Sequence, residues 1–140
     1  MSRVVVDASV AVKWFLPEIH SEAALRYLDG DYERVAPDLL YAEFGNVIWK
    51  RARRTELSDD EAREALRSLR LVPIEVHPAQ PFLETAYEVA RTLDRTVYDA
   101  LYLVLASAHK CPMVTADRRF YEAAANSPLA ESIRWIEAGT

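Results

Sequence analysis

The feature that most constrains this chain is the alternation of short apolar runs with longer amphipathic segments. The first run, residues 3–7, reads Arg-Val-Val-Val-Asp, and such a continuous run is typical of a strand buried in a parallel sheet. Strands that alternate with helices predict an α/β fold with a parallel sheet, here as one domain over residues 1–140. We predict further strands at 34–36, 72–76, 113–115 and 133–136, and helices at 10–16, 21–29, 38–54, 58–70, 81–94, 96–109 and 118–126.

Two of the predicted strands are followed by acids. Asp7 ends the first strand, and Asp117 stands just after the fourth. In open parallel sheets, ligands bind beyond the carboxyl ends of the strands, where the strand order reverses. With the order 3-2-1-4-5, the first and fourth strands are neighbours at that point, so Asp7 and Asp117 would meet. Each acid also has a structural interpretation, Asp7 as an Asx turn and Asp117 as a helix N-cap.

Two further acids occupy positions where core residues are expected. Glu43 lies on the same helical stripe as Leu40 and Val47. Asp99 stands in the first turn of a helix that is apolar on all sides, which predicts that this helix is buried. The alternatives are that Glu43 lies at the edge of the stripe or pairs with an Arg, and that Asp99 closes a capping box with Thr96.

Together these acids predict a cation site. At separations of roughly 6 Å and an effective dielectric constant of about 20, each pair of carboxylates repels by about 3 kcal/mol. Four clustered acids would therefore have to share protons or hold cations. Hard divalent ions such as Mg²⁺ or Mn²⁺ are the natural occupants of an all-oxygen site.

The acidic motifs resemble those of a known family. The segments Asp7-Ala8-Ser9, 41–46 around Glu43, Tyr98-Asp99-Ala100 and Thr115-Ala116-Asp117 resemble the motifs of PIN-domain ribonucleases, and VapC toxins of toxin–antitoxin pairs in particular. The resemblance covers essentially the whole chain. It implies a PIN-like three-layer sandwich with a five-stranded parallel sheet in the order 3-2-1-4-5. It also implies a metal-dependent endoribonuclease that cleaves RNA, is usually dimeric and is inhibited by a partner antitoxin.

The resemblance also assigns roles to residues. Asp7, Glu43 and Asp99 would hold a first Mg²⁺ or Mn²⁺ ion, and Asp117 would complete the site, with a second ion as one way to do so. Ser9, Thr115 and Asn46 lie close to these acids in sequence and would orient a carboxylate or a water; local turn bonds are the alternative. We predict RNA phosphate contacts from Lys13, Arg118, Arg119 and the basic run 50–54, for which a solvated helix end is the alternative.

Composition narrows the class of protein. Seventeen Lys and Arg against 22 Asp and Glu give a net charge of −5, which argues against a protein that simply coats nucleic acid. The single Cys111 excludes an internal disulfide, and His20, His77 and His109 show no metal-ligand spacing. We find no signal-peptide pattern and no apolar run long enough to span a bilayer, so we expect a cytoplasmic protein.

Three other functions fit the sequence less well. A receiver-like phosphorylation domain needs an acidic pair after the first strand and a lysine after the last, but Ala8 and Ser9 follow Asp7 and no lysine follows Lys110. A haloacid-dehalogenase-like phosphatase needs Asp-x-Asp, and position 9 is Ser. A catalytically inactive PIN-like binding module should have lost some of the acids.

The partner surfaces can also be predicted. We expect some of Trp14, Phe15 and Trp49 to form a homodimer surface. We expect the antitoxin to insert an Arg or Lys among the acids and to dock between the helices at 38–54 and 58–70.

Overall fold

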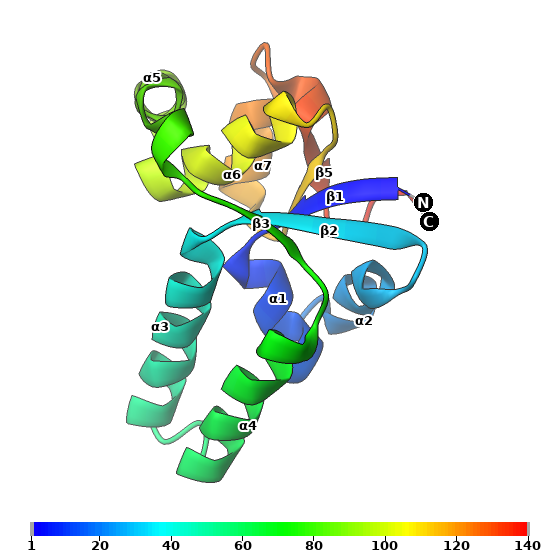
Figure 1. Cartoon of the computed structure of the whole chain (residues 1–140), viewed down its shortest axis with the longest axis vertical. Coiled ribbons are helices and arrows are strands. Elements are labelled where there is room, and N and C mark those ends of the chain that lie inside the picture. The colour runs from blue at the N-terminus through cyan, green and yellow to red at the C-terminus, as the bar shows by residue number, and fades with distance from the viewer. Residues whose placement is uncertain (1, 140) are drawn as a thin grey trace.

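The computed structural model describes residues 2–139, which form a parallel sheet between two layers of helices (Figure 1). The sheet order is β3-β2-β1-β4-β5, and every adjacent pair is parallel, which confirms the predicted α/β topology. The strands are β1 (Ser2–Val6), β2 (Tyr32–Pro37), β3 (Glu75–His77), β4 (Met113–Thr115) and β5 (Ile133–Trp135).

Helices cover both faces of the sheet. In Figure 1, α1 to α4 lie on one side of the sheet and α5 to α7 on the other, and α3 and α4 form a hairpin that extends away from the strands. The helices are α1 (Ala8–Phe15), α2 (Ser21–Leu25), α3 (Leu39–Arg53), α4 (Asp59–Leu71), α5 (Leu83–Leu93), α6 (Val97–Ala108) and α7 (Arg118–Ala125), with 3₁₀ turns η1 (Arg26–Leu28), η2 (Gln80–Phe82) and η3 (Ala130–Ser132).

The central position of β1 follows from its sequence. Val4, Val5 and Val6 are fully buried, because both faces of this strand are covered by helices. Helix α6 is buried from Ala100 to Ala106, as its uniformly apolar sequence predicts. Val6 pairs with Val114 of β4, so the two strands end side by side and the residues that follow them share one edge of the sheet.

Three local predictions need correction. The third strand is Glu75–His77 rather than residues 72–76, because α4 continues to Leu71 and pairing with β2 begins at Glu75. The helix predicted at 38–54 begins at Leu39 and ends at Arg53; Asp38 precedes it, and its side chain makes no capping hydrogen bond. The segment 21–29 is helical only to Leu28, and its last turn is the 3₁₀ turn η1.

The large aromatic residues divide between core and surface. Trp14 is buried and its Nε1 donates to the carbonyl of Ala24 at 2.9 Å. Phe15 packs edge-on against Trp14 and Phe44. Trp14 therefore belongs to the core, not to the surface expected for a partner, whereas Trp49 is 55% exposed. Among residues 2–139, no helix combines the length and the apolar character that a membrane span requires.

Candidate active site

The predicted acids meet in one cavity. Asp7, Glu43, Asp99 and Asp117 all line a cavity of about 310 Å³ at the carboxyl edge of the sheet. Asp7 follows β1, Glu43 comes from α3, Asp99 from the first turn of α6, and Asp117 precedes α7. The other lining residues are Ala8, Ser9, Asn46, Val47, Lys50, Tyr102 and Phe120.

Asp7 combines a structural and a chemical role. It is the N-cap of α1, and its Oδ1 accepts from the Val10 amide at 3.0 Å and from the Ser9 hydroxyl at 2.7 Å. Within residues 2–139 both hydrogen bonds reach Oδ1, which leaves Oδ2 as a ligand atom. The pKa of Asp7 is raised to about 6, mainly by burial; the hydrogen bonds from Ser9 and Val10 oppose this increase, and the charges of Asp99 and Glu43 add to it.

Glu43 is half-buried on α3, as its place in an apolar stripe predicts. The Tyr102 hydroxyl on α6 donates to its Oε1 at 2.6 Å. Burial raises the pKa of Glu43, the Tyr102 hydrogen bond lowers it, and Asp99 adds to the increase. Tyr102 therefore holds one oxygen of Glu43 and leaves Oε2 as a second ligand atom.

Asp99 and Asp117 share one cation, the guanidinium of Arg95. Its NH2 nitrogen donates to Asp99 Oδ2 at 3.1 Å and to Asp117 Oδ2 at 2.5 Å. Asp117 Oδ1 accepts from the Phe120 amide at 3.1 Å and so caps α7. Both carboxylate oxygens of Asp117 thus accept hydrogen bonds, whereas Oδ1 of Asp99 accepts none from residues 2–139. Burial is the main cause that raises the pKa of Asp99, and Arg95 opposes it.

Arg95, like Tyr102, contacts the predicted acids but was not predicted from the sequence. Its guanidinium lies 5.3 Å from the centre of the Phe120 ring, and its Nε is buried without a hydrogen-bond partner among residues 2–139. Arg95 precedes Asp99 by four residues, which is the spacing of neighbours on a helix face. This spacing is only a weak signal for a contact here, because Thr96 is the N-cap of α6 and Arg95 lies before the helix begins.

The predicted supporting residues divide into two groups. Ser9 and Asn46 line the cavity. Thr115 is fully buried behind it, and its hydroxyl accepts from the Asp117 amide at 3.1 Å. Ser9 therefore orients the Asp7 carboxylate, and Thr115 orients the backbone that carries Asp117.

Of the predicted RNA contacts, Lys50 lines the acidic cavity, whereas Lys13, Arg118 and Arg119 do not. Lys13 is buried and its ammonium donates to Glu18 Oε1 at 2.7 Å, so the structure gives it a structural partner. Arg118 is exposed and stacks 4.0 Å from the centre of the Trp135 ring, and Arg119 is exposed beside it. Lys50 is the basic residue that lines the cavity.

A separate cluster was not expected from the sequence. Ligand atoms of Glu75, His77 and His109 lie within 4.8 Å of one another, although the spacing of these residues along the chain gave no such signal. The guanidinium of Arg3 donates to both Glu75 oxygens at 2.8 Å and lies 3.1 Å from His109 Nδ1. This cluster already contains a cation and lies outside the acidic cavity.

The donor set of the acidic cavity fits a hard divalent cation. It consists of carboxylates from four segments of the chain, and oxygen is the ligand atom that Mg²⁺ and Mn²⁺ prefer. The raised pKa values of Asp7, Glu43 and Asp99 show that these carboxylates are not fully compensated by their protein partners. A cation in the cavity would relieve that imbalance.

Comparison with known proteins agrees with this geometry. The model of the family described as PIN domain matches residues 4–126. Ribonuclease VapC3 from Pyrobaculum aerophilum is 36% identical over 122 residues, which are 86% of this chain and 93% of that protein.

Solved structures share the fold. PAE2754 from Pyrobaculum aerophilum superposes with a TM-score of 0.70 at 23% identity and covers 97% of this chain and 85% of its own. VapBC2 from Rickettsia felis, solved with a DNA fragment from its promoter, superposes with a TM-score of 0.63 at 14% identity over 95% of this chain and 98% of its own. The chain belongs to the PIN-domain family, and its similarity to the curated sequences groups it with the VapC ribonucleases.

Proposed function

We propose that this protein is a metal-dependent endoribonuclease and the toxin of a toxin–antitoxin pair. The observation that carries the proposal is the single cavity lined by four carboxylates, in a chain whose relative at 36% identity is a VapC ribonuclease. A receiver-like domain is disfavoured because it needs a lysine after its last strand, whereas the lysine that lines this cavity, Lys50, comes from α3 and no lysine follows Lys110. An inactive binding module is disfavoured because every acid is present.

Asp7, Glu43 and Asp99 are the residues proposed to hold Mg²⁺ or Mn²⁺. Each has one oxygen without a hydrogen bond from residues 2–139: Oδ2 of Asp7, Oε2 of Glu43 and Oδ1 of Asp99. A divalent ion bound there lowers the pKa of a coordinated water and stabilises negative charge on a phosphate. Asp117 has both oxygens engaged, so Arg95 takes the place that a second ion would need.

The first test is removal of the metal. RNA cleavage by the purified protein is expected to stop in EDTA and to return when Mg²⁺ or Mn²⁺ is added in excess, because the carboxylates alone supply no electrophile for the phosphate. The measurement is cleavage of total cellular RNA, followed by gel electrophoresis. Full activity in EDTA would contradict the proposal.

Glu43→Gln controls for a contaminating nuclease in that assay. Gln keeps the acceptor for the Tyr102 hydroxyl but removes the charge, so the variant is expected to fold normally and to lose cleavage at every metal concentration. Cleavage that persists in this variant would come from another enzyme. Unfolding of the variant would instead assign Glu43 a structural role.

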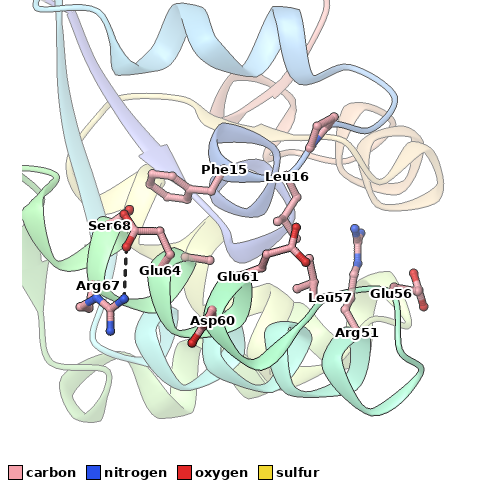
Figure 2. A pocket seen from close by; sticks show the side chains of 12 residues that line it. Phe15, Leu16, Arg51, Glu56, Leu57, Asp60, Glu61, Glu64, Arg67 and Ser68 are labelled. Carbon is pink, nitrogen blue, oxygen red and sulfur yellow. Dashed lines mark hydrogen bonds and ion pairs between the residues drawn. The ribbon is translucent and has the colours of Figure 1, made fainter.

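The proposed antitoxin partner fits a second, larger cavity. A groove of about 800 Å³ runs between the end of α1 and helix α4. Figure 2 shows Phe15 and Leu16 on the α1 side, facing α4. The walls are thus α1 and α4, with Arg51 as the one lining residue from α3, rather than the α3–α4 pair expected from the sequence. The acidic residues along the groove are Glu56, Asp60, Glu61 and Glu64.

Apolar side chains with an acidic rim suit an amphipathic segment that carries Lys or Arg. The double variant Asp60→Lys with Glu64→Lys is therefore expected to weaken binding of the cognate antitoxin by at least about tenfold, since reversing charges replaces attraction with repulsion. Isothermal titration calorimetry measures this affinity. RNA cleavage by the free toxin should stay unchanged, and unchanged antitoxin affinity would place the partner elsewhere.

A homodimer, which the resemblance implies, stays a prediction. Leu83 and Tyr87 on α5 are both more than half exposed, and they supply an apolar face for a second copy. This face lies on the side of the sheet opposite to the groove between α1 and α4 (Figure 1), so a dimer formed there would leave the groove open.

A further inference from the structure

An aromatic and basic surface adjoins the acidic cavity at the end of α3. Trp49 is 55% exposed, the most exposed of the three Trp in the chain. The guanidinium of Arg53 lies over its ring, 5.5 Å from the ring centre. Trp49, Lys50, Arg53 and Arg54 line a hollow of about 380 Å³, which we name the Trp49 surface.

The Trp49 surface is continuous with the acidic cavity. Lys50 lines both hollows. Asn46, which lines the acidic cavity, and Trp49 are three residues apart on α3 and so are neighbours on its face. From Glu43 to Trp49 the helix rises by about 9 Å. A strand that crosses the acids would therefore reach Trp49 within a short step along the helix.

The exposed ring of Trp49 lies among three basic side chains, a combination that suits an anionic partner with flat rings. Large exposed apolar side chains favour association with a partner, and the nearby Lys and Arg residues select an anionic one. Other basic residues of this region serve the fold: Arg51 and Lys13 both pair with Glu18. Lys50, Arg53 and Arg54 are exposed and form no salt bridge with another residue among residues 2–139.

We propose that the Trp49 surface binds the RNA substrate next to the cleavage site, with an unpaired base stacked on Trp49 and flanking phosphates held by Lys50, Arg53 and Arg54. Bases that are not stacked in a duplex are the ones that aromatic side chains bind in RNA. The surface would thus favour single-stranded or looped RNA over a regular duplex. This inference rests on the proposed ribonuclease function.

Binding without cleavage tests the proposal independently of catalysis. The probe is a fluorescein-labelled single-stranded RNA dodecamer, measured by anisotropy in EDTA. Trp49→Ala is expected to weaken binding by about tenfold, because the base loses the aromatic ring on which it stacks. Trp49→Phe should restore most of the affinity, whereas Trp49→Leu should not. The matched control is Leu71→Ala, which removes another large exposed apolar side chain, at the end of α4 and outside the Trp49 surface.

A second measurement separates stacking from charge. Arg53→Gln is expected to lower the slope of log affinity against log salt by about 1, whereas Trp49→Ala should leave that slope unchanged. In the cleavage assay with metal, Trp49→Ala should raise KM and leave kcat nearly constant, because the base is bound equally in ground and transition states.

The outcomes distinguish this inference from the proposed function. If wild type cleaves RNA but Trp49→Ala binds the dodecamer as well as wild type does, the Trp49 surface is not an RNA site and the ribonuclease proposal stands. If wild type fails to cleave any RNA, the proposed function fails first. If Trp49→Ala instead converts a dimer to a monomer in analytical ultracentrifugation with unchanged RNA affinity, the surface binds a second copy of the chain and the inference is overturned.

Discussion

Replacing Asp7 by Asn is expected to abolish RNA cleavage and at the same time to stabilise the metal-free protein. The loss of cleavage follows from the loss of a proposed metal ligand. Changing residues that only support a metal ligand already costs about 10- to 100-fold, so we expect a decrease beyond about 100-fold. Asn keeps an oxygen that accepts from Val10 and Ser9, so the cap of α1 survives.

The gain in stability follows from the raised pKa of Asp7. Burial raises this pKa from 3.8 to about 6, so the folded state binds a proton more tightly than the unfolded state. The protonated group therefore contributes its full stability below about pH 4, and this contribution is lost as the pH rises through about 6. At pH 7.5 the ionised carboxylate destabilises the metal-free fold by about 3 kcal/mol, at about 1.4 kcal/mol for each pKa unit.

Urea unfolding in EDTA measures this difference. Asp7→Asn should be more stable than wild type at pH 7.5, and the two should converge near pH 4. Adding Mg²⁺ should reduce the gap at pH 7.5, because metal that binds the native wild type stabilises it. The matched control is Asp31→Asn, which neutralises an exposed acid away from the cavity. A variant that is less stable than wild type at pH 7.5 would show that Asp7 acts mainly as a structural cap.

Replacing Arg95 by Met is expected to increase the number of bound Mn²⁺ ions. The guanidinium of Arg95 is the cation between Asp99 and Asp117. Met is an unbranched apolar side chain that can still pack against Phe120 but carries no charge. Without the guanidinium, the two carboxylates repel each other and attract a divalent ion more strongly. We expect the affinity for a second Mn²⁺ to be at least about tenfold higher in Arg95→Met than in wild type, which is about 1.4 kcal/mol. At a concentration at which wild type holds one Mn²⁺, Arg95→Met should therefore hold two.

Native mass spectrometry and electron paramagnetic resonance titration measure the stoichiometry. The control is Arg91→Met, which removes an exposed Arg of α5 that pairs with Glu88 on the surface. In the absence of metal, Arg95→Met should be less stable by about 1–2 kcal/mol, since the broken ion pairs are only partly buried. Equal stoichiometry and affinity in wild type and variant would show that Arg95 does not occupy a cation position.

The sequence determined the topology and the acidic cavity. Short strands with a continuous apolar core, such as Val4–Val6, can be buried only between helical layers. Asp7 and Asp117 follow two strands that lie side by side, and their short side chains stay where the backbone places them. Glu43 could be predicted because an acid within an apolar helical stripe has to point toward the core edge. These positions depend on local patterns that a single sequence carries.

The tertiary structure decided which cation each acid contacts. Arg95 reaches two acids from the loop before α6, whereas Lys13 is directed to Glu18 instead of RNA. The guanidinium and ammonium groups lie at the ends of long, flexible side chains, so their partners depend on surfaces that only the packed helices create. For the same reason the groove between α1 and α4 and the exposure of Trp49 could not be read from the chain: both depend on how the α3–α4 hairpin packs against α1.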